Sequence, residues 1–372
     1  IHEARTLEEG LDIMASWKSA PQNVAIASSD GRVGLTMSGY LPRRIGFDGT
    51  VPTEWSGGVR WAGELPMSAR PRFVRDASGY VFSANNRIAS VESLAPIGTW
   101  FPDGSRAHRI DEVLSREKPV DELDMLALQN DTRTRRHDAW RDLVLERVPA
   151  DTEDDLLAGA RVAASEWSGH ADLDEDAHAF VRSVEWAVTG RVLAPFEELV
   201  RAHDPNTGRA TRFSPDVALR LIAAEPAHLL SPAYDSWDML VLDGIRSAAS
   251  SVASRNGGEL RPRWGDVHTA SIEHPIAQIA GDIMPGLRAP SDGLAGDWSS
   301  VRVTGSNFGA SVRIVVAPGH EERGVFHMPG GQSGDPRSPH FLDGHAAWVT
   351  GEATPLLPGE AVRTITLEPA AP

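Results

Sequence analysis

The sequence predicts an α+β fold, in which a sheet-forming core is interrupted by a long helical segment. Short β-prone runs occur within residues 22–37, and similar runs return within residues 301–328. Between them, from Ile110 to Ser254, apolar residues recur mainly at helical spacing. Strands, then helices, then strands again indicate a core with an inserted subdomain. We therefore expect three parts: sheet-forming residues 1–110, a helical subdomain over 111–256, and return strands in 257–372.

The first part begins with a capped helix and a hairpin. Thr6 and Glu9 have the spacing of a capping box, which predicts a helix over residues 6–17. Residues 24–27 and 33–37 are predicted as strands, joined by an Asp30-Gly31 turn. Residues 79–87 are predicted as a further strand that ends in Asn85 and Asn86. Strand alternation would turn these two amides to opposite faces.

The helical part divides at its prolines and glycines. We expect one helix to start at Asp111, and others over residues 121–148, 151–165, 174–202, 215–224 and 236–254. The helices are expected to form one structural subdomain. Its buried positions are predicted to include Leu123, Leu126, Leu143 and Leu145.

Charge and composition exclude several classes of function. The net charge of −16 argues against a nucleic-acid partner, because phosphate binding needs clustered Lys and Arg. The absence of cysteine excludes thiol catalysis, thiolate metal sites and disulfides. No apolar run approaches the roughly 18 residues that a membrane helix needs. The chain begins at Ile1 without a signal peptide, so we expect a processed or truncated piece of a longer protein.

Two segments carry candidate functional residues. An amide at the end of the 79–87 run would offer N–H donors at a fixed place, as an oxyanion hole requires, although an Asn-rich turn is the alternative. Residues 330–341 combine three glycines and two prolines with Gln332, Ser333 and His340. That segment is either a loop whose backbone is held in unusual dihedral angles close to a functional site, or a rigid polar loop that connects the last strand to the core. His268 and His274 have no obvious carboxylate neighbour to complete a zinc site, so we expect them to bond to backbone and predict no metal site.

Several segments, in order, carry a family resemblance. They are Pro21-Gln22-Asn23 with the strand after it, residues 39–44, 61–66, 79–87, 106–114 and 129–131, residues 264–269 with His274-Pro275, and residues 331–341 with Asp343 and Trp348. Together they cover nearly the whole chain, and they resemble the penicillin acylase family of N-terminal nucleophile hydrolases. The resemblance implies a four-layer αββα sandwich, represented here by its later strands and interrupted by helices. It also implies hydrolysis of an acyl amide bond.

The resemblance further implies roles for individual residues. The nucleophile would be a Ser, Thr or Cys that self-cleavage exposes at the start of the large subunit, with its own α-amine as the base. Asn85 would be the oxyanion-hole donor, Arg106 would position it, and Gln22 would line the acyl pocket. We further expect residues 331–340, including Gln332, Ser333 and His340, to pack rigidly against the Asn85 strand end, with their glycines at positive φ or in close backbone contact. Ile1 has no nucleophilic atom, so the nucleophile is expected upstream of this chain or outside it.

The expected partners are the upstream part or small subunit of the same precursor and a small N-acyl amide substrate. The chemistry needs no cofactor, and a structural calcium ion in the complete enzyme would draw mostly on upstream ligands. Family members are usually exported, so a periplasmic or secreted location is expected. Two alternatives stay open: a non-catalytic binding or scaffolding relative, and an unrelated carbohydrate-active protein with a carboxylate pair.

Overall fold

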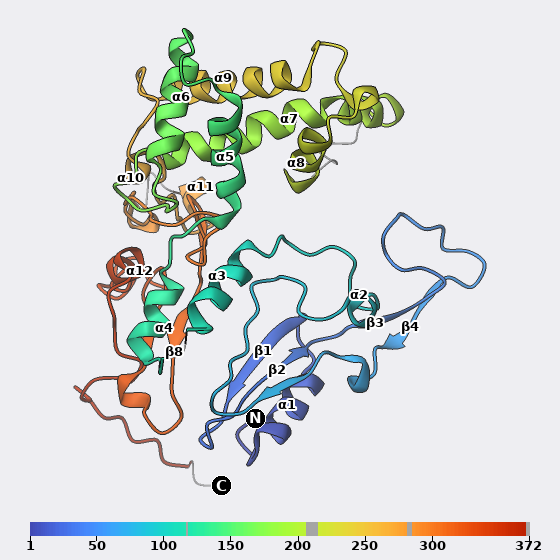
Figure 1. The fold of residues 1–372 in the computed structure, drawn as a ribbon. Helices are drawn as coiled ribbons and strands as arrows, with labels where there is room; N and C mark the ends of the chain where they lie inside the picture. Colours follow the sequence, from blue (N-terminus) through green and yellow to red (C-terminus); the bar gives the residue numbers. More distant parts are fainter. Residues whose placement is uncertain (117, 206–214, 281–284, 370–372) are drawn as a thin grey trace. The chain divides into compact units, whose positions relative to one another are not determined.

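The computed structural model describes residues 1–116, 118–205, 215–280 and 285–369 (Figure 1). The chain forms two compact units. Unit 1 comprises Ile1–Gln129, Ser311–Gln332 and Leu342–Pro372, and unit 2 comprises Asn130–Ala310 and Ser333–Phe341. The three-part domain division drawn from the sequence, with bounds at residues 110 and 256, stays a prediction.

Unit 1 combines a small sheet with short helices. Its elements are α1 (Leu7–Ser16), β1 (Gln22–Ala27), β2 (Val33–Ser38), β3 (Pro42–Ile45), β4 (Arg60–Glu64), η1 (Met67–Ala69), β5 (Phe73–Arg75), α2 (Val91–Leu94), α3 (Ser105–Leu114), α4 (Glu122–Gln129), β8 (Arg313–Val315), η5 (Glu321–Arg323), β9 (Val325–His327) and α12 (His345–Thr350).

Helix α1 begins and packs as its sequence predicts. Thr6 Oγ1 accepts a hydrogen bond from the Glu9 backbone N–H at 3.2 Å, and the Glu9 carboxylate accepts from the Thr6 N–H at 3.2 Å. This capping box satisfies backbone donors that have no partner inside the helix. Leu7 and Leu11 are buried. The packing is close, because a Cβ at Gly34 of β2 would lie 2.7 Å from Leu11 Cδ1.

Strands β1, β2 and β5 form an antiparallel sheet in that order. Ala25 lies opposite Leu35 in the β1–β2 hairpin, and Gly34 lies opposite Val74 of β5. The predicted turn passes through Gly31 at φ 86°, a conformation that glycine adopts without strain. β2 is therefore the central, largely buried strand, and β1 lies at an edge.

The strand predicted over residues 79–87 does not form. This segment has no regular secondary structure, and Asn85 takes the left-handed φ of 63°. Among the described residues, no strand pairs with it, so its backbone groups must find other partners. The alternation of Asn85 and Asn86 that we inferred from strand geometry is therefore wrong.

Several of the predicted helices have different bounds in the structure: α6 begins at Asp155 and α7 at His178, each four residues later than predicted. The segment at Asp111 is the end of α3, which begins at Ser105, and not the start of a helix. The helix predicted over 121–148 is broken between Gln129 and the short η2–α5 segment. At this break the backbone forms hydrogen bonds with a segment that is distant in the sequence. Thr134 N–H donates to the Gly169 carbonyl, and Ala171 N–H donates to the Thr132 carbonyl, both at 3.0 Å.

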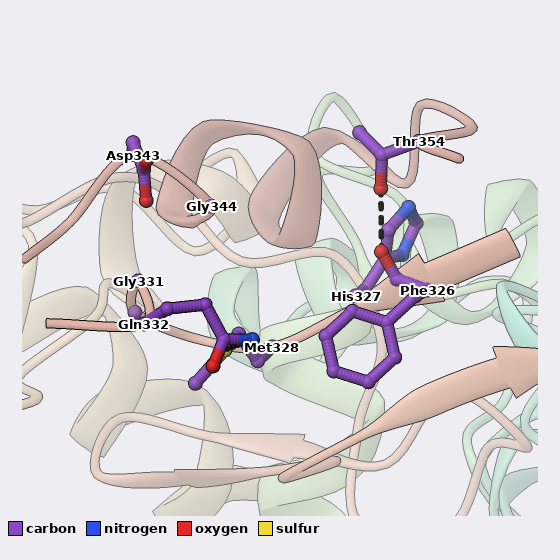
Figure 2. A pocket seen from close by; sticks show the side chains of 9 residues that line it. Phe326, His327, Met328, Gly331, Gln332, Asp343, Gly344 and Thr354 are labelled. Atoms are coloured by element: carbon purple, nitrogen blue, oxygen red, sulfur yellow. Dashed lines mark hydrogen bonds between the residues drawn. The ribbon is translucent and has the colours of Figure 1, made fainter. Parts of the chain in front are cut away.

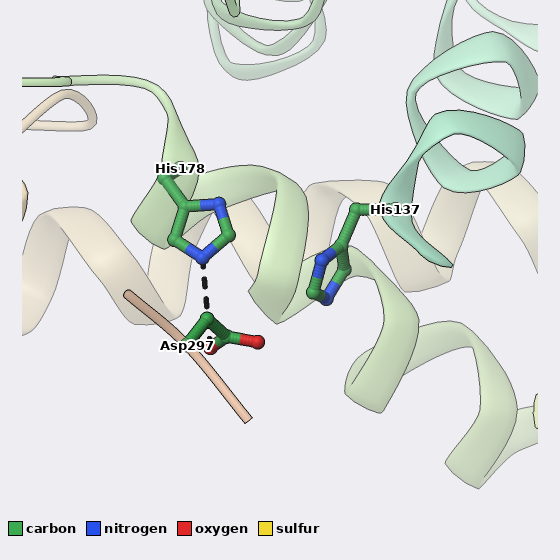
Figure 3. Close-up of side chains that lie close together, drawn as sticks. All are labelled: His137, His178 and Asp297. Atoms are coloured by element: carbon green, nitrogen blue, oxygen red, sulfur yellow. Dashed lines mark ion pairs between the residues drawn. The ribbon is translucent and has the colours of Figure 1, made fainter. Parts of the chain in front are cut away.

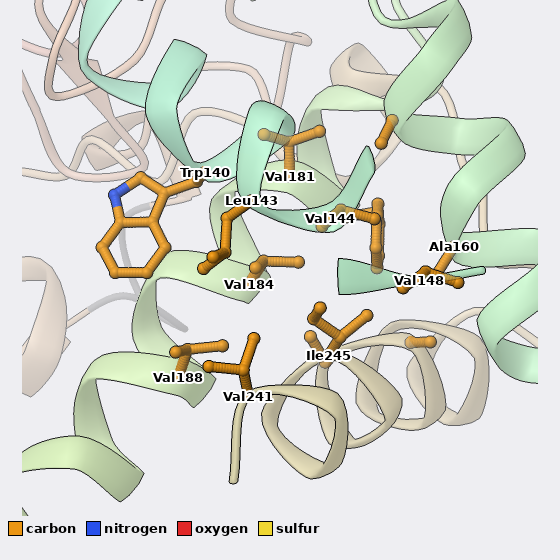
Figure 4. Close-up of a cluster of buried hydrophobic side chains, with 14 of the residues drawn as sticks. Trp140, Leu143, Val144, Val148, Ala160, Val181, Val184, Val188, Val241 and Ile245 are labelled. Atoms are coloured by element: carbon orange, nitrogen blue, oxygen red, sulfur yellow. The ribbon is translucent and has the colours of Figure 1, made fainter. Parts of the chain in front are cut away.

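Unit 2 has a helical core (Figure 4). Its elements are η2 (Arg135–His137), α5 (Asp138–Arg147), α6 (Asp155–Glu166), α7 (His178–His203), α8 (Pro215–Ala224), η3 (Ala227–Leu229), α9 (Trp237–Arg255), α10 (Trp264–Val267), α11 (Ala277–Ala280), η4 (Pro285–Leu287), β6 (Thr304–Gly305) and β7 (Phe308–Gly309). Helices α5, α6, α7 and α9 contribute fully buried residues, including Val144, Ala160, Val184 and Ile245.

The four leucines chosen from the sequence lie in different environments. Leu143 is buried and Leu145 is partly buried in the core of unit 2. Leu126 is buried in unit 1, where α4 packs on β8 and contacts the Val315 and Val325 cluster. Leu123 is 60% exposed, so that prediction is wrong. Helices α3 and α4 belong to unit 1, and the later helices of this region belong to unit 2.

The returning strands are short. The run predicted over residues 301–304 yields only the two-residue β6, which pairs with β7 in unit 2. In unit 1, β8 pairs with β9, with Ile314 opposite Phe326. Helix α12 follows and ends at Gly351, whose φ is 80°. Across the described parts of the chain, no helix combines the length and apolar character needed to cross a membrane.

Candidate active site

Asn85 lies at the centre of a tight turn in unit 1. Its φ of 63° is in the left-handed region, which asparagine tolerates better than most residues. The next residue stabilises the turn: Asn86 Oδ1 accepts from the Ala84 backbone N–H at 3.0 Å, and Asn86 Nδ2 donates to the Arg87 carbonyl at 3.2 Å. The amide group of Asn86 is thus used in hydrogen bonds within the turn, whereas Asn85 is exposed.

Arg106 sets the direction of the Asn85 amide. Its Nη2 donates to Asn85 Oδ1 at 3.1 Å. A guanidinium can only donate, so the amide oxygen must face Arg106, and the Nδ2 group is directed away from it. Arg106 comes from the first turn of α3, where Asp103 Oδ1 accepts from the Ser105 backbone N–H at 2.9 Å. Burial lowers the pKa of Arg106, and the negative charge of Asp103 opposes this.

Two further contacts anchor the segment that leads to Asn85. Asn23 Nδ2 in β1 donates to Ser83 Oγ at 2.7 Å. The Tyr80 hydroxyl donates to Asp111 Oδ1 at 2.6 Å, and this bond, with burial, raises the pKa of Tyr80. Sequence reasoning missed these anchors. Asn23 lies beside Gln22 in a segment that had been singled out, but nothing in the pattern pairs it with Ser83.

The other predicted site residues have fewer contacts that would indicate a role. Gln22 is exposed at the start of β1, opposite Ser38, next to Asn23, which anchors the segment. Gln332 is exposed in unit 1, and its Nε2 lies 3.3 Å from Met328 Sδ. Ser333 and His340 belong to unit 2, where the Ser333 N–H donates to the His340 carbonyl at 3.0 Å. Their predicted roles, and the support they would give Asn85, stay predictions.

A pocket of about 180 Å³ adjoins Gln332 (Figure 2). Its walls come from β9, the glycine segment after it and the start of α12: Phe326, His327, Met328, Gly330, Gly331, Gln332, Asp343, Gly344 and Thr354. Gly334, in unit 2, does not fit our expectation of positive φ or close contact. Its φ is ordinary, and no other atom lies within 4 Å of a Cβ built there.

The histidines near residue 270 bond to backbone, as expected. His268 is buried, with Nδ1 2.9 Å from the Leu294 carbonyl. His274 Nδ1 accepts from the Ile276 backbone N–H at 3.1 Å. Instead, His137, His178 and Asp297 form a buried group in unit 2 that could hold a metal ion. Sequence reasoning missed it, because the three residues lie far apart in the chain.

The comparisons with known proteins agree with this architecture. The penicillin amidase family model matches residues 1–363. This chain belongs to the penicillin amidase family. A penicillin acylase 2 proenzyme from Pseudomonas sp. (strain SE83) is 25% identical over 99% of this chain and 49% of its own length. An acyl-homoserine lactone acylase, QuiP, from Pseudomonas aeruginosa is 23% identical over 94% of this chain and 46% of its own length.

A solved structure has a similar fold. A thermostable penicillin G acylase from Alcaligenes faecalis matches 99% of this chain and 71% of its own, with a TM-score of 0.58 and 16% identity. The predicted α+β fold class is confirmed, and the fold resembles that of this penicillin G acylase. This chain spans about half the length of the curated relatives it matches.

Proposed function

We propose that this chain is a component of an N-acyl amide hydrolase of the penicillin acylase type. Family membership supports the reaction class. In such a reaction, a nucleophile attacks the acyl carbonyl, and the carbonyl oxygen becomes an oxyanion. The amine leaves with a proton, and water then releases the acyl group from the enzyme.

Asn85 is the proposed oxyanion donor. The observation that carries this role is the Arg106–Asn85 hydrogen bond of 3.1 Å, which holds the amide oxygen and leaves Nδ2–H directed elsewhere on an exposed turn. A donor held before the reaction does not have to reorganise as charge develops, which is why such groups stabilise transition states. Arg106 then acts as a positioning residue, and Gln22 lines the acyl pocket.

The nucleophile comes from upstream of this chain or from outside it. We propose a Ser, Thr or Cys with a free α-amine, carried by the upstream part or small subunit of the same precursor, in an enzyme that is periplasmic or secreted. The reaction needs no cofactor. The resemblance would place one downstream acidic calcium ligand near Ala95-Pro96, where the sequence has no acidic residue, and the Pro96 carbonyl there accepts from the cationic Arg44 Nη1 at 2.8 Å. No step here depends on calcium.

The test is a set of Asn85 variants in the complete enzyme. Asn85→Ala should lower kcat by roughly 10²- to 10³-fold, or about 2.7–4 kcal/mol, with a much smaller change in KM. Asn85→Gly relieves the left-handed backbone and should lose the same activity. Asn85→Asp keeps an oxygen facing Arg106 but replaces the donor with an acceptor, so it should be equally inactive.

Two outcomes would contradict this role. Full activity in Asn85→Gly would mean that only the turn conformation matters. A loss confined to KM would place Asn85 in ground-state binding. Asn86→Ala is the neighbouring control: it should have the smaller effect on kcat, and it should lower stability because it removes two local hydrogen bonds. A complete protein without any amidase activity would favour a binding or scaffolding role.

A further inference from the structure

A buried cluster in unit 2 has the composition of a metal site (Figure 3). His137 ends η2, His178 begins α7, and Asp297 lies in the loop before β6. The three residues come from separate segments and are at most 2% exposed. One ligand atom from each lies within 4.8 Å of the others.

Several buried polar atoms in this cluster make no hydrogen bond. Neither ring nitrogen of His178 has a hydrogen-bond partner, and Asp297 Oδ2 has an ion pair with Arg182 but no aligned hydrogen bond. His178 Nε2 lies 3.5 Å from Asp297 Oδ2, too far for a strong hydrogen bond. Buried polar groups nearly always have partners, because an unsatisfied one keeps its full desolvation cost. A cation between these atoms would satisfy them together.

Surrounding contacts orient two of the three ligands. Asp297 Oδ1 accepts from the Ser299 N–H at 3.0 Å and from Ser299 Oγ at 2.9 Å. Ser299 Oγ also lies 3.3 Å from His137 Nδ1. With the hydroxyl proton donated to the carboxylate, the matching tautomer of His137 donates through Nδ1 in that contact. In this tautomer Nε2, which lies 3.5 Å from Glu185 Oε2, carries the lone pair, as in a metal ligand whose other nitrogen is held by an outer partner.

The charges near the cluster are compatible with a divalent ion. Arg136 is paired with Glu185 through Nε and Nη2 at 2.8 and 2.9 Å, so these two largely neutralise each other. Arg182 Nε lies 2.9 Å from Asp297 Oδ2 without hydrogen-bond alignment, and its side chain is 38% exposed. A carboxylate oxygen has two lone pairs, so Oδ2 can face Arg182 and an ion at once.

We propose that His137, His178 and Asp297 bind one structural divalent transition-metal ion of the zinc class. Imidazole donors favour zinc and its neighbours over calcium or magnesium, which prefer oxygen ligands. Three protein ligands leave a fourth position for water. The ion would join η2, the start of α7 and the loop around Asp297, and it would stabilise unit 2. This site is independent of the proposed acylase chemistry.

The test is metal binding by the intact protein. Metal-free protein should take up one equivalent of Zn²⁺, and Co²⁺ should give the visible bands of a low-coordinate nitrogen and oxygen site. Zn²⁺ should also raise Tm, because an ion that binds only the folded state stabilises it. His178→Asn and Asp297→Asn should lose the bands and the Tm increase. His268→Asn, which changes another buried histidine of unit 2, should keep both.

Several results would overturn the proposal. They are a folded wild-type protein that takes up no equivalent of Zn²⁺ or Co²⁺, binding that persists in both cluster variants, and binding that His268→Asn abolishes equally. If the cluster variants fail to fold, the wild-type titration alone decides. Acylase activity is not a readout, so failure of this proposal is distinguishable from failure of the proposed function.

Discussion

At the scale of single residues, the direction of the Asn85 amide depends on one side-chain contact. Arg106 Nη2 is the donor to Asn85 Oδ1, and Arg106 is half-buried at the first turn of α3. The exposed Asn85 side chain has no comparable support from its own turn, since Asn86 makes the local hydrogen bonds. Arg106 should therefore matter for catalysis without touching the substrate.

Arg106→Met should lower kcat by about 10- to 100-fold, the usual effect of removing a group that orients a functional residue. The loss should be smaller than in Asn85→Ala, because the amide donor remains and can still reach the oxyanion part of the time. Steady-state kinetics on the complete enzyme measure this. The double variant should be no slower than Asn85→Ala; additive losses would mean that Arg106 has a separate role.

Asp154 offers a stability test with a defined pH dependence. It caps α6, accepting from the Leu156 and Leu157 backbone N–H groups at 3.0 and 3.1 Å, and it pairs with Arg246 at 2.8 Å. The Leu157 bond and then Arg246 lower the pKa of Asp154 below 3.8. The unfolded chain then binds a proton at higher pH than the folded chain. The contribution to stability is therefore present above pH 3.8 and is lost as pH falls through the folded pKa.

Asp154→Ala should lower the free energy of unfolding by about 1 kcal/mol at neutral pH. Asp154→Asn should lose less, because asparagine also caps helices. Urea unfolding of the protein, followed by far-UV circular dichroism, measures the free energy of unfolding of both variants. The difference between wild type and Asp154→Ala should shrink below pH 3.8. A difference that stays constant with pH would rule out the charge contribution.

At the scale of elements, two glycines in the α7–α9 pair have opposite roles. Gly244 of α9 faces Val188 of α7, and a Cβ there would lie 2.7 Å from Val188 Cγ2 and 3.1 Å from Val188 Cα. The second contact is with backbone, which cannot move aside easily. Gly190 of α7 has no other atom within 4 Å of such a Cβ. The first glycine permits close helix packing, and the second only loosens its helix.

Gly244→Ala should therefore destabilise by about 1–3 kcal/mol through overpacking. Gly190→Ala should stabilise by about 0.5–1 kcal/mol, because alanine favours the helix and adds no clash. Thermal unfolding of the two single variants is the measurement. Equal shifts of the same sign would show that packing against Val188 does not decide the choice of glycine.

At the scale of the whole molecule, we propose that this chain carries the oxyanion donor and that the nucleophile lies elsewhere. Residues 1–372 purified alone should release no amine from an N-acyl amide, within the limit of a sensitive chromatographic assay. Adding the polypeptide that carries the upstream half should restore hydrolysis, and the same mixture made with Asn85→Ala should restore far less. Turnover by the isolated chain would overturn the division of roles proposed here.

Local sequence signals determined the elements whose ends depend on nearby residues. The capping box of Thr6 and Glu9 starts α1, and the Asp30-Gly31 turn closes the β1–β2 hairpin. Pro215 and Ala224 bound α8 as predicted. Each of these features rests on contacts within a few positions of the chain, so the pattern carries the information. Ordered motifs spread along the chain were enough to indicate the family and the fold class.

Only the tertiary structure decided the features that join distant segments. Residues 79–87 contain strand-forming side chains, but a strand needs a partner, and the turn at Asn85 is instead held by contacts with β1 and α3. The break after Gln129 depends on backbone bonds to residues 169–171. His137, His178 and Asp297 become neighbours only when η2, α7 and a later loop pack together. Such contacts leave no periodic signal, because the free energy that favours them comes from groups far apart in the sequence.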